Sequence, residues 1–175
     1  MQNIIHLLAL VRIDSKTEPR WVPAAVQALA SWVAQHNGYV IDVEPPQLMV
    51  CLPNAGQALA GLHALMTEGD DFGFQLSAGL AQAIRSSDRP PHSPNDFTER
   101  TLQTVIELAG AAGPQQVAIS PKLLSLLQLA VPDYAAWFDA GPPGQQAPAP
   151  PGRLLVLLRG ARLPRYRGTI RICRT

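Results

Sequence analysis

The sequence predicts an α+β fold, in which one largely antiparallel sheet has helices packed on one face. Three observations indicate it. A nearly continuous apolar run over Asn3–Ile13 is typical of a central strand buried on both faces. Two short apolar arms flank a proline-marked bend within Gly38–Leu52, which indicates a hairpin. Segments with apolar residues at helical spacing alternate with these strands, so helices are expected to cover the sheet.

The first helix is expected over Pro23–Asn37. From Val22, apolar residues recur at i, i+4, i+7 and i+11, which defines one helical face. Pro23 suits the first turn, and Gly38 stands where a left-handed residue often ends a helix.

The hairpin follows directly. Its arms run from Tyr39 to Val43 and from Leu48 to Leu52, with Pro45 and Pro46 near the tip. Proline has no N–H and a fixed φ, so this pair suits a turn and not the middle of a strand.

A second helix is expected from Ala55 to about Thr67, with Asn54 as its N-cap. Asp70–Gly73 is then expected to form a turn, and the alternating residues of Phe74–Leu80 a strand. The composition of Arg85–Asn95 is that of a loop.

Asp96 or Thr98 can cap a third helix that runs to about Ala112. A short strand at Val117–Ile119 and a short helix starting at Pro121 follow. The apolar stripe of the third helix consists of Leu102, Val105, Ile106 and Ala109.

One domain is expected, in three parts. Residues 1–140 form its body, with a further strand at Tyr134–Phe138. Residues 141–152 are a linker rich in proline and glycine. Residues 153–175 contain closing strands at Arg153–Leu158 and Gly168–Cys173 and an arginine-rich tail, as part of the same domain.

Charge is distributed unevenly along the chain. Residues 1–152 carry seven basic and thirteen acidic residues, a net charge of −6, whereas residues 153–175 carry seven arginines and no acid. This asymmetry indicates an electrostatic contact, within the fold or with a partner. The 47% hydrophobic content is that of a globular protein.

The two cysteines, Cys51 and Cys173, lie in apolar runs and are expected to be buried, reduced thiols. The N-terminal run lacks a basic start and is interrupted by Arg12 and Asp14, which argues against a signal peptide. No run reaches the roughly 18 apolar residues of a membrane span. A soluble, cytoplasmic protein is expected.

Three segments, in order, resemble the catalytic domain of class III nucleotidyl cyclases. The segment HNGYVIDVEPPQLMVCLPNAGQALAGLHALM is similar to the family's hairpin and following alanine-rich helix. FQLSAGLAQA is similar to its glycine-containing strand, and TVIELAGAAGPQQVAISPKLLSLL to its helix–strand run. The resemblance covers about residues 4–140 and implies a cyclase-like sandwich with a ferredoxin-like core.

The family holds two catalytic metal ions with two aspartates, and both are replaced in this chain. The resemblance places the first at Arg12 and the second at Pro46, with the family's neighbouring glycine at Pro45. Divalent cations of this kind need oxygen ligands. A guanidinium repels them, and proline offers no side-chain ligand.

The family's ribose- and phosphate-contacting asparagine and arginine fall at Gln103 and Glu107. A carboxylate at the second position reverses the charge that a triphosphate requires. The two half-sites of the family come from opposite chains of a dimer, and this chain lacks both. The resemblance therefore implies no cyclase activity, and no bound cofactor or metal is expected.

Two positions that read the base in the family fall at Asp42 and Asp96. Either could accept a hydrogen bond from a nucleotide base, or they could be a solvated strand residue and a helix cap. An active cyclase with a rearranged metal site would use Asp14, Asp42 and Glu44 instead. No glycine-rich phosphate loop is present.

The C-terminal segment departs from the family pattern. Its arginines could bind phosphates or an acidic protein surface, or could protect an edge strand from aggregation. Nucleic acid is not an expected partner, because aromatic residues do not alternate with the basic ones. The candidate interaction residues are Arg162, Arg165, Arg167, Arg171 and Arg174.

The function expected from these observations is that of a catalytically inactive cyclase-homology domain. It would act as a regulatory protein–protein interaction module in bacterial-type signalling, with another protein or its own second copy as partner. The alternative is a sensor that binds a nucleotide or cyclic dinucleotide without turnover.

Overall fold

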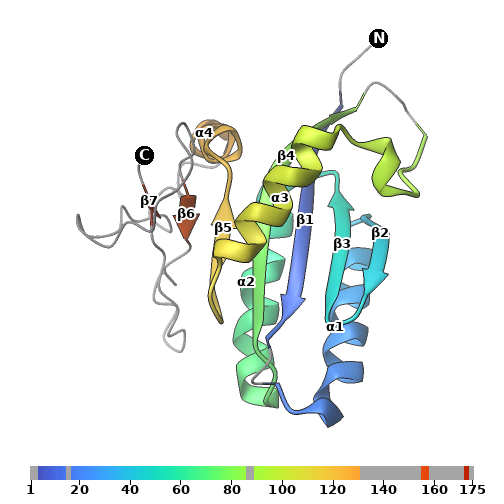
Figure 1. Cartoon of the computed structure of the whole chain (residues 1–175), viewed down its shortest axis with the longest axis vertical. Helices are drawn as coiled ribbons and strands as arrows, with labels where there is room; N and C mark the ends of the chain where they lie inside the picture. Colours follow the sequence, from blue (N-terminus) through green and yellow to red (C-terminus); the bar gives the residue numbers. More distant parts are fainter. Residues whose placement is uncertain (1–3, 15–16, 86–88, 131–154, 158–171, 174–175) are drawn as a thin grey trace.

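The structure is a computed structural model that describes residues 4–14, 17–85, 89–130, 155–157 and 172–173. Seven strands form one sheet in the order β2-β3-β1-β4-β5-β6-β7 (Figure 1). The strands are β1 (Ile4–Ile13), β2 (Tyr39–Glu44), β3 (Gln47–Leu52), β4 (Leu76–Arg85), β5 (Val117–Ile119), β6 (Leu155–Leu157) and β7 (Ile172–Cys173). The helices are α1 (Val22–Gln35), α2 (Ala55–Phe72), α3 (Glu99–Ala111) and α4 (Pro121–Ala130), with short 3₁₀ turns at Pro19–Trp21 and Pro94–Asp96.

The sheet is mostly antiparallel, and among the described strands only β4 and β5 pair in parallel. The apolar β1 is central, with β3 on one side and β4 on the other, and its residues Leu7 to Val11 are buried. The predicted α+β class and the strand–helix–hairpin order are confirmed.

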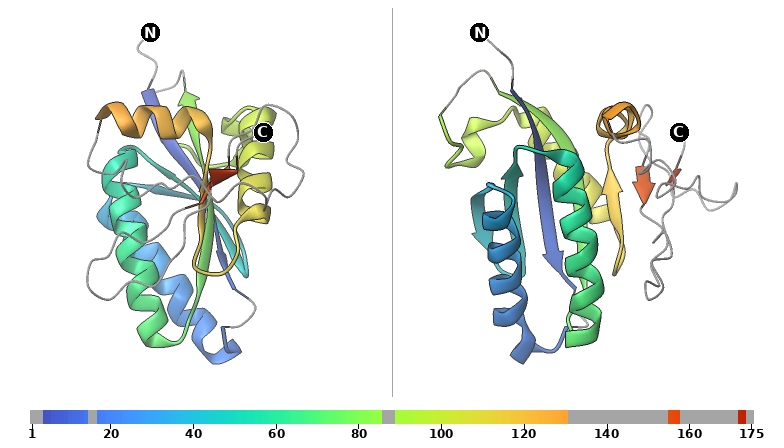
Figure 2. Two further views of the ribbon diagram at one scale, coloured as in Figure 1. Left: turned by 90° about the vertical axis from the view of Figure 1, so that its left-hand side faces the viewer. Right: turned by 180° about the vertical axis from the view of Figure 1, so that it is seen from behind.

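The helices cover both faces of the sheet, which corrects the expectation that they pack on one face. Figure 2 shows α1 and α2 on one side of the strands and α3 on the other. The split follows from β1, which is apolar on both faces: Leu7, Ala9 and Val11 face one helix layer, and Leu8 and Leu10 face the opposite side.

A glycine of β4 sets how closely α3 approaches the sheet. A Cβ atom added to Gly79 would lie 2.3 Å from the backbone nitrogen of Ala109 and 2.5 Å from the carbonyl oxygen of Val105. The backbone of α3 therefore rests directly on β4, and only a residue without a side chain fits there.

Two helix ends differ from the sequence expectations. In α1, the left-handed residue is Asn37 (φ 53°) and not Gly38, whose N–H bonds to the carbonyl of Val33. In α2, the expected turn at residues 70–72 is helical, and Gly73 (φ 85°) ends the helix. At both ends the residue after the left-handed one donates its N–H to the carbonyl five positions earlier, Gly38 to Val33 and Phe74 to Gly69, which characterises a Schellman motif.

The additional turn of α2 has a tertiary cause. Phe74 is buried, and its ring lies against Gly69, where an added Cβ would come within 2.5 Å of it. The N–H of Phe74 bonds to the carbonyl of Gly69 at 2.9 Å. Packing of this ring thus stabilises helical backbone beyond Thr67, where the sequence pattern ends.

Several sequence expectations fall outside the described residues. They are the strand at Tyr134–Phe138, the linker at 141–152, and Arg162, Arg165, Arg167, Arg171 and Arg174. Within the described residues, no helix has the length and apolar character needed to cross a bilayer.

Candidate functional site

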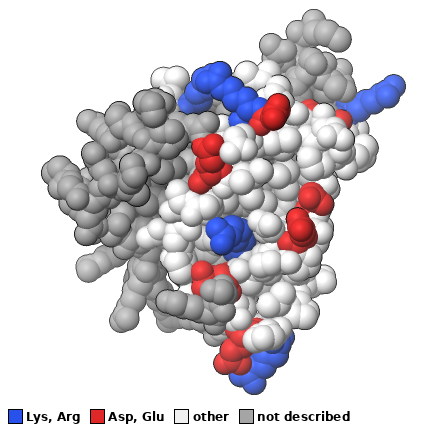
Figure 3. Space-filling model, viewed as in Figure 1, with Lys and Arg blue, Asp and Glu red and all other residues white. Residues whose placement is uncertain are grey.

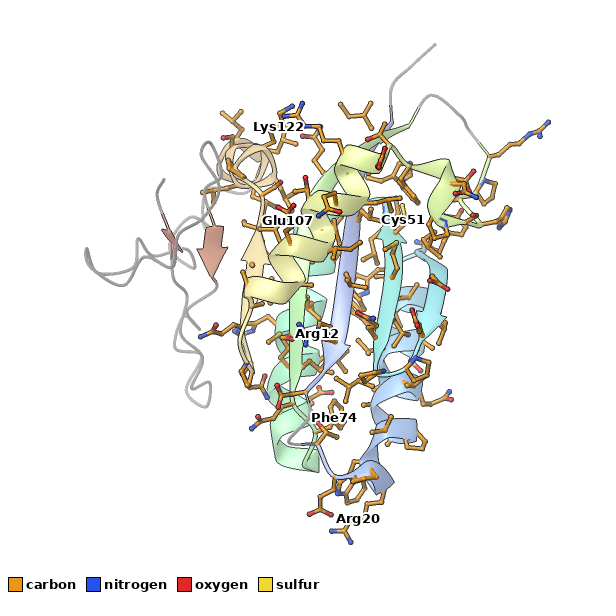
Figure 4. The ribbon with its side chains drawn as sticks, viewed as in Figure 1. Arg12, Arg20, Cys51, Phe74, Glu107 and Lys122 are labelled. Atoms are coloured by element: carbon orange, nitrogen blue, oxygen red, sulfur yellow. The ribbon has the colours of Figure 1, made fainter. Side chains whose placement is uncertain are left out.

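The candidate site lies on the sheet face that carries α3. Residues paired across neighbouring strands point to the same face, so Glu44, Gln47, Arg12 and Ser77 form one row across four strands. Arg12 lies near the end of β1 and is exposed (Figure 4). A cation thus occupies the middle of the row, at the position to which the sequence resemblance assigns a metal-binding aspartate.

The Arg12 side chain is bonded to α3. Its guanidinium Nη1 donates a hydrogen bond of 3.1 Å to the carbonyl oxygen of Ala109, in the last turn of that helix. The last four carbonyls of a helix lack partners within it and carry the negative end of its dipole. Arg12 therefore acts as a C-terminal cap for α3 and joins this helix to β1.

The hairpin tip lies beside Arg12. Gln47 is the β3 residue paired with Arg12, and the carbonyl oxygen of Pro46 accepts a 2.7 Å hydrogen bond from the Ile13 N–H. The Pro45–Pro46 peptide bond is cis. The fold therefore brings positions 12 and 46 together, as the resemblance implies, but it supplies a guanidinium and a proline ring there.

A cavity of about 210 Å³ opens next to this row. Asp42 and Glu44 contribute carboxylates to it from β2, and Gln47 an amide from β3. Figure 3 shows acidic side chains on several sides of a central basic group on this face. The complete lining consists of Leu10, Asp42, Glu44, Gln47, Met49 and Ile106.

Gln103 and Glu107 lie one turn apart on α3. The Gln103 Nε2 donates a 2.9 Å hydrogen bond to the Glu107 Oε1. Glu107 is labelled on α3 in Figure 4. The pair satisfies part of its own hydrogen-bonding capacity, and its net charge is negative.

The two candidate base contacts have different surroundings. Asp42 lines the cavity, whereas Asp96 does not. The Asp96 Oδ2 accepts hydrogen bonds from the backbone N–H groups of His92 and Ser93 at 2.8 and 3.1 Å. Asp96 is thus part of a capping box of the 3₁₀ turn, and Thr98 caps α3.

The rearranged metal site is not assembled. Asp42 and Glu44 share the cavity, but Asp14 does not line it. No group of three or more His, Cys, Asp or Glu side chains among the described residues is placed to hold a metal ion.

The exposure of Ile106 was not predicted from the sequence pattern. Ile106 belongs to the expected apolar stripe of α3, yet it is 48% exposed and lines the cavity. Helical spacing shows which residues share a helix face, but not how far the sheet extends beneath that face. The neighbouring Gln103 and Glu107 are the available signal that this edge of the stripe lies against solvent.

No model of a known protein family matches the chain, and no curated protein matches it either. Solved structures do match it. An adenylate cyclase from Trypanosoma brucei, solved in its monomeric state, aligns over 97% of this chain and 94% of its own, with 12% identity and a TM-score of 0.66. The adenylyl cyclase CyaB from P. aeruginosa aligns over 93% of this chain and 97% of its own, with 11% identity and a TM-score of 0.64.

A non-canonical dimeric guanylyl cyclase domain of the RhoGC fusion protein from the aquatic fungus Blastocladiella emersonii also matches. It aligns over 74% of this chain and 86% of its own, with 11% identity and a TM-score of 0.54. These similarities show that the chain has the fold of class III adenylyl and guanylyl cyclase domains. At such low identity they establish the fold alone.

Proposed function

We propose that this chain is a catalytically inactive nucleotidyl-cyclase-homology domain that acts as a regulatory protein–protein interaction module in signalling. The observation that carries the proposal is the hydrogen bond from Arg12 to Ala109, at the position where the resembled cyclases hold a metal ion. The guanidinium both opposes a divalent cation and contributes to the fold.

The remaining site positions support the same proposal. Pro46 offers only a backbone carbonyl, which already accepts the Ile13 N–H. On α3, Glu107 would face the triphosphate with a negative charge. Asp42 and Glu44 leave carboxylates in the cavity, but the resembled family also takes a metal-binding aspartate from the position of Arg12 on β1.

The proposed interaction surface is the α3 face, and the proposed partner is a cyclase-like domain, a second copy included. Ile106 is an apolar group 48% exposed at the edge of the cavity, between Gln103 and Glu107. Leu10, Met49 and Ile106 form the apolar part of this cavity's lining, and Asp42, Glu44 and Gln47 the polar part. A concave surface of this mixed character suits contact with a partner protein. A guanylyl cyclase domain with this fold was solved as a non-canonical dimer, which supports self-association as one form of partnership without indicating which face makes the contact.

The activity test is direct. The purified protein is incubated with ATP or GTP and Mg²⁺ or Mn²⁺, and cyclic nucleotide and pyrophosphate are measured. We expect neither product. Formation of a cyclic nucleotide that is lost in an Asp42→Asn/Glu44→Gln variant would replace the proposal with a rearranged active site.

The interaction test uses sedimentation velocity over a range of protein concentrations. We expect self-association that is weakened by Ile106→Glu. Leu129→Glu is the matched control, because Leu129 is an 82% exposed apolar residue on α4, away from this cavity. A chain that stays monomeric at all concentrations would exclude the second copy as partner.

The second candidate is a sensor that binds a nucleotide or cyclic dinucleotide without turnover. The favouring observation is that Asp42, at a base-reading position, lines the cavity beside Glu44.

The test is a thermal-shift titration with ATP, GTP, cyclic AMP, cyclic GMP and cyclic di-GMP, with and without Mn²⁺. A ligand at 100 times its Kd stabilises the folded state by about 2.7 kcal/mol. A selective shift that Asp42→Ala abolishes would favour the sensor, and no shift would favour the interaction module.

A further inference from the structure

A second cavity of about 520 Å³ lies at the other end of α3, where β5 stops. β5 pairs with β4 only as far as Leu80, and the chain then turns into α4 after a hydrogen bond from the Ser120 N–H to the Leu80 carbonyl. The stretch of β4 from Ala81 onward therefore has no strand partner on that side within the described part of the chain. The beginnings of α3 and α4 close the space beside it.

The cavity is lined by cations and hydroxyls. Arg100 comes from the first turn of α3 and Lys122 from the first turn of α4. Figure 4 shows Lys122 at the same end of the molecule as the start of α3. No carboxylate lines this cavity among the residues that the structure describes, although the described chain is rich in acids.

The backbone adds to the positive potential. α3 has 13 residues and α4 has 10, and each begins at the rim of the cavity, at the caps Thr98 and Ser120. The Ser120 hydroxyl accepts the Leu123 N–H at 3.3 Å, and the Thr98 hydroxyl accepts the Thr101 N–H at 3.3 Å. Two helix dipoles therefore point their positive ends toward a space that already holds two side-chain cations.

Apolar groups of β4 also line the cavity. Ala81 and Ile84 are among them, and Ile84 has 58% of its surface exposed. A bare phosphate would leave most of the volume empty, whereas cavities of roughly 300–1,000 Å³ suit small organic ligands. A cavity lined by cations, hydroxyls and an exposed apolar side chain matches a small molecule that carries a phosphate on an organic group.

We propose that this cavity binds a phosphorylated small molecule, with its phosphate between Arg100 and Lys122 and its organic part against Ile84. The site shares no lining residue with the cavity of Asp42 and Glu44. It is therefore independent of whether the α3 face binds a partner or a nucleotide.

The test is a titration of the ¹⁵N-labelled full chain, followed by amide NMR shifts at constant ionic strength. The probes are ribose 5-phosphate, inorganic phosphate and ribose. We expect saturable shifts at the amides of Arg100, Thr101 and Lys122 with ribose 5-phosphate, weaker binding of inorganic phosphate and no shift with ribose. Arg100→Gln and Lys122→Gln should each weaken binding about tenfold, the loss of one charged hydrogen bond.

Arg20→Gln is the matched control, since Arg20 is an exposed arginine that pairs with Glu18 at 2.6 Å, away from the cavity. It should bind ribose 5-phosphate as the unaltered chain does. Equal affinity for inorganic phosphate and ribose 5-phosphate would overturn the role of Ile84. Shifts that do not saturate, or that survive the Arg100→Gln/Lys122→Gln double variant, would overturn the site itself.

Discussion

The guanidinium of Arg12 donates a hydrogen bond of 3.1 Å to the carbonyl oxygen of Ala109 and so connects β1 to the end of α3. The contact gives Arg12 a structural role that does not depend on any ligand.

Arg12→Ala should lower the free energy of unfolding by about 1–2 kcal/mol, because a charged hydrogen bond and a favourable dipole interaction are lost together. Urea denaturation measures the effect. Arg20→Ala, which removes an exposed ion pair with Glu18 and a cation–π contact with the ring of Trp21, should change stability by less than about 1 kcal/mol. Equal effects of the two substitutions would show that the contact with Ala109 contributes nothing.

Gly79→Ala should destabilise the protein by about 3 kcal/mol or more, because the new Cβ would overlap the backbone of α3. Gly110→Ala is the matched control within the same helix. No atom lies within 4 Å of the Cβ that it adds, so it should stabilise α3 by about 0.5–1 kcal/mol. Thermal or urea unfolding of both variants would show opposite signs.

Stability should fall as the pH drops below about 6.5, the ordinary pKa of histidine. His63 is 6% exposed on α2, and burial lowers the pKa of its imidazole. The unfolded chain then binds a proton at a higher pH than the folded chain does. Neutral His63 therefore contributes its full stabilisation above the pKa that it has in the unfolded chain. This stabilisation is lost as the pH falls toward the lower pKa that it has in the folded chain.

The measurement is the Tm between about pH 7.5 and pH 5.5, a window chosen above the range in which ordinary carboxylates titrate. His63→Gln should show a smaller decrease in Tm over this window than the unaltered chain. Identical pH profiles would contradict the assignment to His63.

Restoring the cyclase residues should create metal–nucleotide binding if positions 12, 46, 103 and 107 are assigned correctly. The variant is Arg12→Asp/Pro46→Asp/Gln103→Asn/Glu107→Arg, and calorimetry with Mn²⁺–ATP and Mn²⁺–GTP measures its affinity. We expect binding that the unaltered chain lacks, together with lower stability from the loss of the Arg12 contact. The Gln103→Asn/Glu107→Arg variant, with Arg12 in place, serves as the control and should bind less tightly.

Local signals predicted much of the fold. The bend at Pro45–Pro46, the strand Val117–Ile119 and the cap at Thr98 each depend on residues within a few positions of one another, and the structure has all three. The resemblance also implied that positions 12 and 46 lie close together. In the structure Arg12 pairs with Gln47, and the Ile13 N–H bonds to the Pro46 carbonyl, so the two positions are neighbours.

Contacts between distant segments could not be predicted in this way. The helical periodicity of α3 does not show which face of the sheet the helix covers. Arg12 contacts Ala109 only because α3 packs on the face toward which Arg12 points. Arg100 and Lys122 meet at one cavity only because β5 ends after three residues. The exposure of Ile106 likewise depends on how far the sheet extends under α3, and the helical spacing of apolar residues does not show this.

The order of the strands has a practical consequence for anyone who shortens this chain. β5 is only three residues long and entirely apolar, and its outer edge pairs with β6, which comes from far along the sequence. A fragment that ends at Ala130 would present that edge, with its backbone donors and acceptors unpaired, to other molecules. Such a fragment should be prone to aggregate, whereas a fragment that retains β6 and β7 should not.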